Sequence, residues 1–219
     1  ERVKRFYSRV LSTGENPLWR EDLLNSHGMP IIGLGAHSAE YADLPLQWMP
    51  HIQVADVAAS VEAALDLSGT EVMHGKGDDG KSQWAVLLDP NGAAFGIMPV
   101  VSEEDLPPTE GDASAPTGCI SWLDLTISDA SATRDFYRQV VGWSVQDVEM
   151  KDASERYADF NMVGDDGIPA AVICHARGAN LGLPPVWMIY LPVGDLAESL
   201  RRVRREGGKV IKATRGTDG

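Results

Sequence analysis

The sequence predicts an α+β protein made of two similar domains, each containing two strand–helix–strand–strand–strand units. The first observation is a duplication: Trp48-Met49 followed by Asp56 recurs as Trp187-Met188 followed by Asp195. The second is that strand-like and helix-like runs alternate in the same order in both halves. A repeat of this length indicates two copies of a whole domain, because solenoids repeat over much shorter segments.

The chain divides at an acidic segment. Residues 102–117, SEEDLPPTEGDASAPT, are rich in Pro, Ser and Ala and contain almost no apolar residue, which is typical of a linker. We therefore expect a first domain over residues 1–101 and a second over residues 118–219. The first domain should lack its first strand and the second its last strands, since each copy lacks pieces that the other shows.

The second copy shows its elements most clearly. A strand is predicted over residues 120–128, and Asp129 is placed to cap a helix that ends at Gly142. Strands are expected over residues 144–148, 157–163, 170–175 and 186–193. Asp195 is placed to cap another helix, with a further strand at residues 209–213.

The first copy begins inside a helix that contains Phe6 and Tyr7. Asp56 is expected to cap a second helix, whose predicted apolar face consists of Val57, Val61, Ala64 and Leu65. Strands are predicted over residues 70–74, 83–88 and 93–100. The segment Asp89-Pro90-Asn91-Gly92 joins the last two strands, with Pro fixing φ and Gly accepting a left-handed conformation, as a tight hairpin requires.

Composition restricts the classes of partner. The net charge of −13 and the pI near 4.7 oppose binding to nucleic acid or anionic lipid, since both are bound mainly through Lys and Arg. No apolar run approaches the roughly 20 residues of a membrane helix. Cys119 and Cys174 form neither a disulfide framework nor a zinc motif, so we expect reduced, buried thiols in a cytoplasmic protein. The expected partner is a small molecule, and a homodimer is compatible with the sequence.

Several short motifs occur together in one order. They are Phe136-Tyr137 with Gly142-Trp143 in the first helix, Val-x-Asp before the second helix, and the hairpin Asp89 to Ala93. This combination resembles the vicinal oxygen chelate superfamily of glyoxalases, bleomycin-resistance proteins and extradiol dioxygenases, and in particular its tandem glyoxalase-like proteins. The resemblance implies that each domain folds a curved mixed sheet around a cleft, where His, Gln or Glu side chains hold a divalent metal.

The resemblance also implies where those ligands should stand. The corresponding positions here are Met49, Gly96, Trp122 and Met188. None offers the carboxylate or imidazole donors that such metals bind. We therefore expect neither a metal nor another cofactor.

Strand alternation supplies other candidates for the same cleft. His51, Asp124 and Tyr190 lie two residues beyond the lost ligand positions and should face the same side. The predicted ligand-binding residues are therefore Met49, His51, Trp122, Asp124, Met188 and Tyr190. His51, Asp124 and Tyr190 are also candidates for acid–base catalysis. Structural roles for His51 and Asp124, and a role of His51 as the ligand of a displaced metal, stay open.

The remaining aromatic and His residues favour structural roles. Trp48 and Trp187 should point to the opposite strand face as core or interface anchors. His27, His37, His74 and His175 do not share a recognised ligand spacing, so surface or loop positions are expected for them.

The leading functional interpretation is a metal-independent protein that binds a small organic molecule in an apolar cleft. The alternatives are a metal-free acid–base enzyme and a metal-dependent lyase or dioxygenase of the same superfamily. Whether the protein is an enzyme stays open. The sequence lacks the motifs of a P-loop, a dinucleotide-binding fold and a nucleophile elbow.

Overall fold

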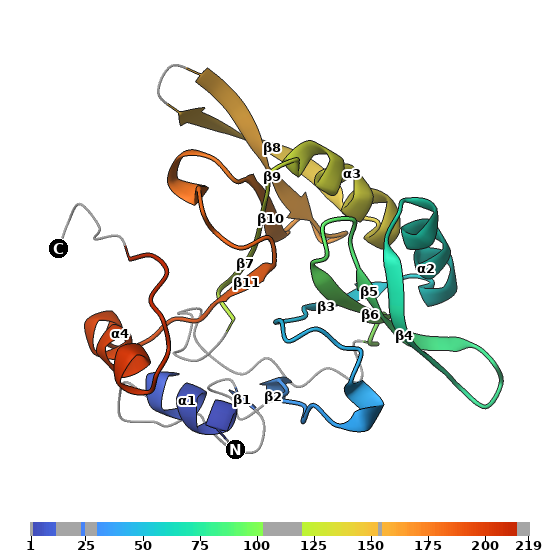
Figure 1. Ribbon diagram of the computed structural model, residues 1–219. Helices are drawn as coiled ribbons and strands as arrows, with labels where there is room; N and C mark the ends of the chain where they lie inside the picture. The colour runs from blue at the N-terminus through green and yellow to red at the C-terminus, as the bar shows by residue number, and fades with distance from the viewer. Residues whose placement is uncertain (1, 12–22, 25–29, 103–119, 153–154, 214–219) are drawn as a thin grey trace. The chain divides into compact units, whose positions relative to one another are not determined.

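The computed structural model describes residues 2–11, 23–24, 30–102, 120–152 and 155–213, which fall into two compact units (Figure 1). One unit comprises residues 37–106 and 122–189, and the other comprises residues 1–36, 107–121 and 190–219. The larger unit thus draws on both sequence copies. The domain boundaries at 1–101 and 118–219 stay a prediction, and Cys119 and most of the linker lie outside the described residues.

The first sheet of the larger unit has four strands in the order β3-β6-β5-β4. Its elements follow the chain as β3 (His51–Val54), α2 (Val57–Asp66), β4 (Thr70–Lys76), β5 (Ser82–Leu88) and β6 (Ala94–Pro99). β3 is parallel to β6, and the other pairs are antiparallel. This is the predicted strand–helix–strand–strand–strand unit, with its first strand beside its last.

The second sheet repeats this topology. It contains β7 (Trp122–Ile127), α3 (Ala130–Val141), β8 (Ser144–Asp152), β9 (Glu155–Val163) and β10 (Pro169–His175). The strand order is β11-β7-β10-β9-β8, with β7 parallel to β10 and β11 (Trp187–Tyr190) next to β7. The α+β class and the repeated unit are therefore confirmed.

Helix starts follow the predicted caps. Asp56 Oδ1 accepts a hydrogen bond from Ala59 N at 3.1 Å, and Asp129 Oδ1 accepts one from Ala132 N at 3.0 Å. Each bond satisfies an amide that the first helical turn leaves without a partner. Gly142 ends α3 with φ of 83°, a left-handed conformation that favours glycine.

The hairpin between β5 and β6 is held by a buried carboxylate. Asp89 Oδ1 accepts hydrogen bonds from Asn91 N at 2.8 Å and Ala93 N at 3.0 Å, and Gly92 has φ of 85°. The predicted tight turn is therefore confirmed. Burial raises the pKa of Asp89, while hydrogen bonds from Ala93, Asn91 and Tyr137 oppose that shift.

A chain of hydrogen bonds crosses the core of the larger unit. Trp187 Nε1 donates to the Tyr137 hydroxyl at 3.0 Å, and that hydroxyl donates to Asp89 Oδ2 at 3.3 Å. Trp187 and Tyr137 are almost completely buried, and Phe95 and Phe136 pack edge-on against the Tyr137 ring. The predicted role of Trp187 as a core anchor is confirmed.

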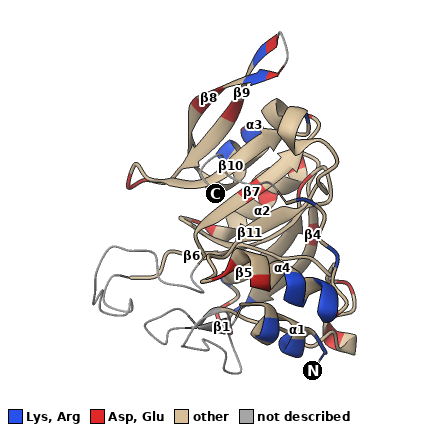
Figure 2. Ribbon diagram, turned by 90° about the vertical axis from the view of Figure 1, so that its left-hand side faces the viewer, with Lys and Arg blue, Asp and Glu red and all other residues tan. Residues whose placement is uncertain are grey.

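The smaller unit contains α1 (Arg2–Leu11), α4 (Leu196–Arg205) and the short strands β1 (Leu23–Leu24) and β2 (Pro30–Ile32). α1 and α4 are joined by an ion pair of 2.8 Å between Arg9 and Glu206. Asp195 caps α4 as predicted, through a bond of 2.8 Å from Glu198 N. Figure 2 shows that Lys and Arg gather on α1 and α4. Three of the four arginines of α4 share the single carboxylate of Glu198, which balances one of their charges.

Two expectations about local structure are wrong. Residues 209–213 form no strand. The equivalent strand, β4, is held by β5, whereas no described strand pairs with residues 209–213. Leu65 is 48% exposed, because Val57, Val61 and Ala64 already complete the face of α2 that the core covers.

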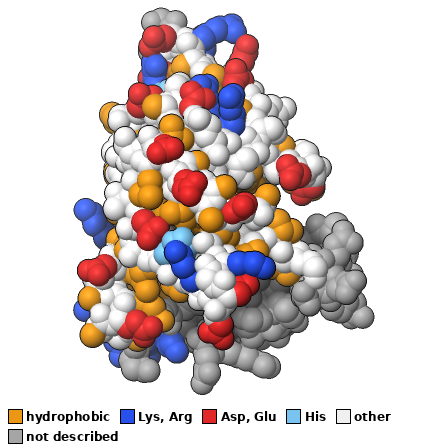
Figure 3. All heavy atoms as spheres, turned by 90° about the vertical axis from the view of Figure 1, so that its right-hand side faces the viewer, with side chains coloured by type: hydrophobic (Ala, Val, Ile, Leu, Met, Phe, Trp, Pro, Cys, Tyr) orange, Lys and Arg blue, Asp and Glu red, His pale blue; other side chains and the backbone are white. Residues whose placement is uncertain are grey.

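The surface mixes charge and apolar groups. On the face drawn in Figure 3, Asp and Glu side chains are interspersed with apolar side chains, Lys and Arg. Among the described residues, none of the helices is both long and apolar enough to cross a membrane.

We predict that Tyr137→Phe lowers the free energy of unfolding by about 1–3 kcal/mol, because the buried Trp187 N–H loses its acceptor. Urea denaturation measures the change as a lower midpoint at unchanged slope. Tyr41→Phe is the matched control, since Tyr41 is 37% exposed. Equal midpoints for the two variants would show that the buried hydroxyl contributes nothing.

Candidate functional site

Of the four positions that the superfamily pattern assigns to ligands, Trp122 is on β7, Gly96 is on β6, Met188 is on β11 and Met49 lies just before β3. β3 and β7 are equivalent, since each pairs in parallel with the last strand of its own unit. In the first sheet His51 is opposite Gly96, and in the second Asp124 is opposite Val172. The two sheets can therefore be compared strand by strand.

On the first sheet, the His51 side chain lies over Gly96. A Cβ atom built on Gly96 would come within 2.6 Å of His51 Nε2, a distance that real Cβ contacts do not show. His51 Nδ1 is 3.2 Å from the backbone oxygen of Met49. His51 is exposed, while the alternating Ile52 and Val54 are buried, so the imidazole is on the face away from the core. It fills the space that a side chain at position 96 needs.

The same sheet carries an aromatic residue that the sequence analysis did not single out. Val86 pairs with Gly96, and Trp84 precedes Val86 by two residues, so strand alternation places Trp84 on the His51 face. Trp84 is 39% exposed, and its indole lies over Gly75 of the neighbouring strand. A second ring thus covers a glycine on this face.

The second sheet holds the other four predicted residues. Trp122 and Asp124 are half-buried on β7. On the adjoining β11, Met188 is half-buried and Tyr190 is 45% exposed, while the preceding Trp187 is buried. The structure therefore brings Trp122, Asp124, Met188 and Tyr190 onto neighbouring strands.

Met49 and His51 belong to the first sheet, Met49 as a half-buried residue shortly before β3. The six residues are thus divided between two sheets. That they line a single ligand-binding cleft stays a prediction.

A polar cluster on the second sheet extends beyond the predicted residues. The Asp159 carboxylate, 3% exposed, accepts hydrogen bonds from His175 N at 2.8 Å and from His175 Nδ1 at 3.0 Å. Burial raises the pKa of the Cys174 thiol to about 12, and the negative charges of Asp159 and Asp124 add to that shift. Cys174 is therefore a protonated thiol at neutral pH and not a nucleophile.

The surface or loop positions expected for His74 and His175 are wrong. Both are strand residues with carboxylate partners, His74 with Glu71 at 3.1 Å and His175 with Asp159. Glu71 is three residues from His74, so this spacing in the sequence was a weak indication of the pair. The Asp159 pair had none, because the two residues come from different strands. His37 is exposed as expected, and His27 lies outside the described residues.

The donor set does not fit a divalent metal. Met49, Gly96, Trp122 and Met188 supply no carboxylate or imidazole, and the His51 ring lies where a ligand side chain at position 96 would extend. Within the described part of the chain, no three His, Cys, Asp or Glu residues are grouped so that they could hold a metal ion.

Comparison with known proteins supports the resemblance stated above. Residues 120–219 match the sequence model of the Glyoxalase/Bleomycin resistance protein/Dioxygenase superfamily. The resemblance to that superfamily, inferred from the motifs of the chain, is confirmed.

Individual relatives are more distant. The glyoxylase-like protein CFP32 of Mycobacterium bovis is 31% identical over 94 residues, which are 43% of this chain and 35% of CFP32. The anthracycline biosynthesis protein DnrV of Streptomyces peucetius is 24% identical over 186 residues, which are 85% of this chain and 58% of DnrV. The chain thus spans about a third and somewhat over half of these two relatives.

Solved structures show weak similarity. A glyoxylase/bleomycin resistance protein/dioxygenase domain from Frankia is 18% identical, with a TM-score of 0.37 over 61% of this chain and 93% of that one. A mutant of 4-hydroxymandelate synthase from Streptomyces coelicolor is 11% identical, with a TM-score of 0.43 over 74% of this chain and 53% of that one.

We predict that Gly96→Ala lowers the free energy of unfolding by about 1–3 kcal/mol, because the new methyl group collides with the His51 ring. In a His51→Ala background the same substitution should cost much less. Denaturation of the single and double variants measures this coupling. Additive effects would mean that His51 does not occupy the space above Gly96.

Proposed function

We propose that this protein binds a small planar organic molecule without the help of a metal ion. The observation that carries the proposal is the pair of His51 and Gly96, in which an imidazole covers the position where the superfamily pattern places a metal ligand. Met49, Trp122 and Met188 at the other such positions support it, since their side chains offer apolar contact area in place of hard donors.

The residue types favour a flat ligand. Trp122 and Met188 are half-buried on neighbouring strands, so they keep part of their surface open to a molecule. Aromatic faces give large contact area at low entropic cost, and Met adapts to irregular shapes. Asp124, Tyr190 and His51 add polar groups that can orient a ligand by hydrogen bonds.

The names of two relatives suggest a ligand class. DnrV and its counterpart DauV from Streptomyces sp. strain C5 are both named anthracycline biosynthesis proteins. Anthracyclines contain planar fused rings with hydroxyl and quinone groups. We therefore propose hydroxylated polycyclic aromatic molecules as the ligands of this chain, and 2-hydroxyanthraquinone as a simple probe of that class.

We propose further that the protein acts in the cytoplasm and that small molecules are its principal partners, with a homodimer as the assembly to test. Sedimentation at several protein concentrations distinguishes a monomer from a dimer. The acidic overall charge supports the absence of a nucleic-acid partner.

Purified protein should contain less than one equivalent of any transition metal, and EDTA should leave its melting temperature unchanged, because the donors of a metal site are replaced. Elemental analysis and thermal denaturation with and without the chelator measure this. One tightly held ion per chain would contradict the proposal.

Binding of 2-hydroxyanthraquinone should quench tryptophan fluorescence, and Trp122→Phe should remove most of the quenching if Trp122 contacts the ligand. His51→Ala should weaken binding by about 0.5–3 kcal/mol if the ligand bonds to its ring, the usual range for one hydrogen bond. Fluorescence titration measures both effects.

Trp143→Phe is the matched control for the fluorescence change. Trp143 stacks at 6.1 Å on the Tyr137 ring, which belongs to the core. Equal loss of quenching in the two Trp variants, or no binding by the wild type, would count against the proposed site.

A further inference from the structure

The Asp159–His175 pair differs from an ordinary surface ion pair. The carboxylate is almost fully buried, whereas the His175 side chain is 21% exposed. Asp159 Oδ1 receives both the backbone N–H of His175 and its ring Nδ1. Two bonds from one residue fix the imidazole relative to the carboxylate.

The strand register explains this geometry. The pairing between β9 and β10 ends where Ile173 is opposite Phe160. The next residues of β10 continue along β7, where His175 is opposite Ile127. The His175 amide thus bonds to the Asp159 side chain of β9. The middle of β10 pairs with both β9 and β7, whereas at its end only the pairing with β7 continues, which leaves the imidazole near the sheet margin.

A carboxylate at Nδ1 selects one tautomer of the neutral ring. The proton sits on Nδ1, facing Asp159, and the Nε2 lone pair becomes the basic atom. Among the described residues, no hydrogen-bond partner of His175 Nε2 is recorded. The available nitrogen is therefore a proton acceptor with a fixed direction.

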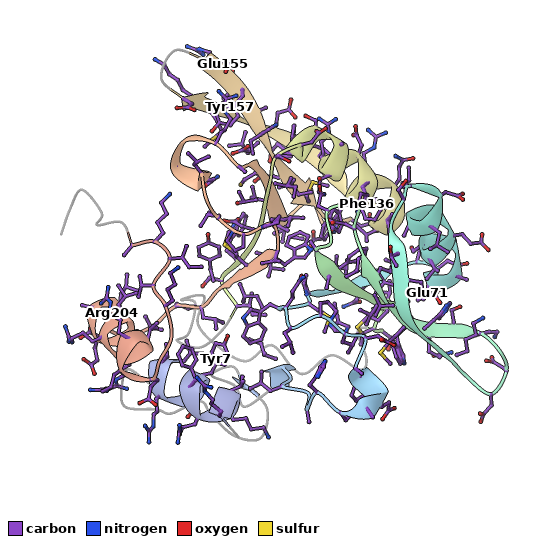
Figure 4. All side chains as sticks on the ribbon, viewed as in Figure 1. Tyr7, Glu71, Phe136, Glu155, Tyr157 and Arg204 are labelled. Atoms are coloured by element: carbon purple, nitrogen blue, oxygen red, sulfur yellow. The ribbon has the colours of Figure 1, made fainter. Side chains whose placement is uncertain are left out.

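Two aromatic side chains pack against the His175 ring. Tyr157 packs against His175 at 5.6 Å with an interplanar angle of 83°, and the Phe160 ring lies at 6.0 Å. The Arg177 guanidinium lies 4.3 Å above the Tyr157 ring and forms ion pairs with Glu155 and Asp152 (Figure 4 labels Tyr157 and Glu155). Because Tyr157 is itself held by Arg177, the His175 imidazole keeps one orientation before a ligand binds.

We propose that His175, oriented by Asp159, accepts the proton of an acidic hydroxyl group on a small molecule bound at the second sheet. This inference rests on the proposed function and names the ligand chemistry: phenols and enols. The ligand O–H bond breaks and an N–H bond forms at Nε2, giving an imidazolium next to the Asp159 carboxylate and an oxyanion on the ligand. Return of the same proton restores both partners, so no other reactant is consumed.

The first sheet provides a matched comparison. His74 also pairs with a carboxylate through Nδ1, but its Nε2 is 2.8 Å from Ser82 Oγ. Its second nitrogen is occupied, so His74 should not accept a ligand proton. Each of the two histidines pairs with a carboxylate through Nδ1. They differ at Nε2, which bonds to Ser82 in His74 only.

A first measurement needs no ligand. In protein labelled with ¹⁵N-histidine, NMR at a pH where the ring is neutral should show His175 protonated on Nδ1. Asp159→Asn should shift the ring toward the Nε2-protonated tautomer that neutral imidazole side chains favour in water. An Nε2-protonated His175 in the wild type overturns the inference.

A second measurement uses 2-hydroxyanthraquinone, whose absorption band moves to longer wavelength when its hydroxyl ionises. The bound dye should ionise at a pH about one unit lower in the wild type than in His175→Gln, a tenfold change in proton affinity. His74→Gln should behave like the wild type. Equal ionisation in the wild type and His175→Gln overturns the inference.

The two measurements separate the two proposals. Failure of the dye to quench tryptophan fluorescence in the wild type overturns the proposed ligand class, and the NMR tautomer still decides the role of His175. Quenching without a difference between His175→Gln and the wild type supports ligand binding and overturns proton transfer.

Discussion

The larger unit depends on a buried line of hydrogen bonds from Trp187 through Tyr137 to Asp89. A carboxylate in the core is costly unless its oxygens are bonded, and Asp89 meets this condition with two backbone amides and one hydroxyl. Any shift of the hairpin, of α3 or of β11 would leave a buried polar atom without its partner. These three segments therefore have one favourable arrangement.

The same interaction sets a dependence on pH. Burial raises the pKa of Asp89, so the folded protein holds this proton more tightly than the unfolded chain, whose value is 3.8. Its contribution to stability is fully present below that value and is lost as pH rises through the folded pKa. Once ionised, the buried carboxylate thus has a net cost, which the hydrogen bonds around it reduce. Asp89 serves to fix the hairpin and α3 in place more than to add stability.

The sequence predicted the helix caps and one hairpin, in which a side chain bonds to the backbone a few residues away. Asp56, Asp129 and Asp195 cap helices a few residues away, and the Asp89 hairpin closes on itself, so these features follow from short patterns. The strand at 209–213 was predicted wrongly, since a strand exists only where another pairs with it. The Asp159–His175 pair was missed for a related reason: it depends on where one strand leaves another.

The candidate site also shows that features which depend on strand pairing cannot be predicted from short sequence patterns. The structure has His51 on the face of β3 away from the core, and its position over Gly96 depends on the register between β3 and β6. Trp84 over Gly75 repeats the arrangement, so on this sheet glycines accept rings where other residues would project side chains. A metal ligand at position 96 and an imidazole at position 51 therefore compete for one volume. A carboxylate side chain at position 96 would require His51 to move first, and for that reason the glycine at position 96 and the placement of His51 are a single structural feature.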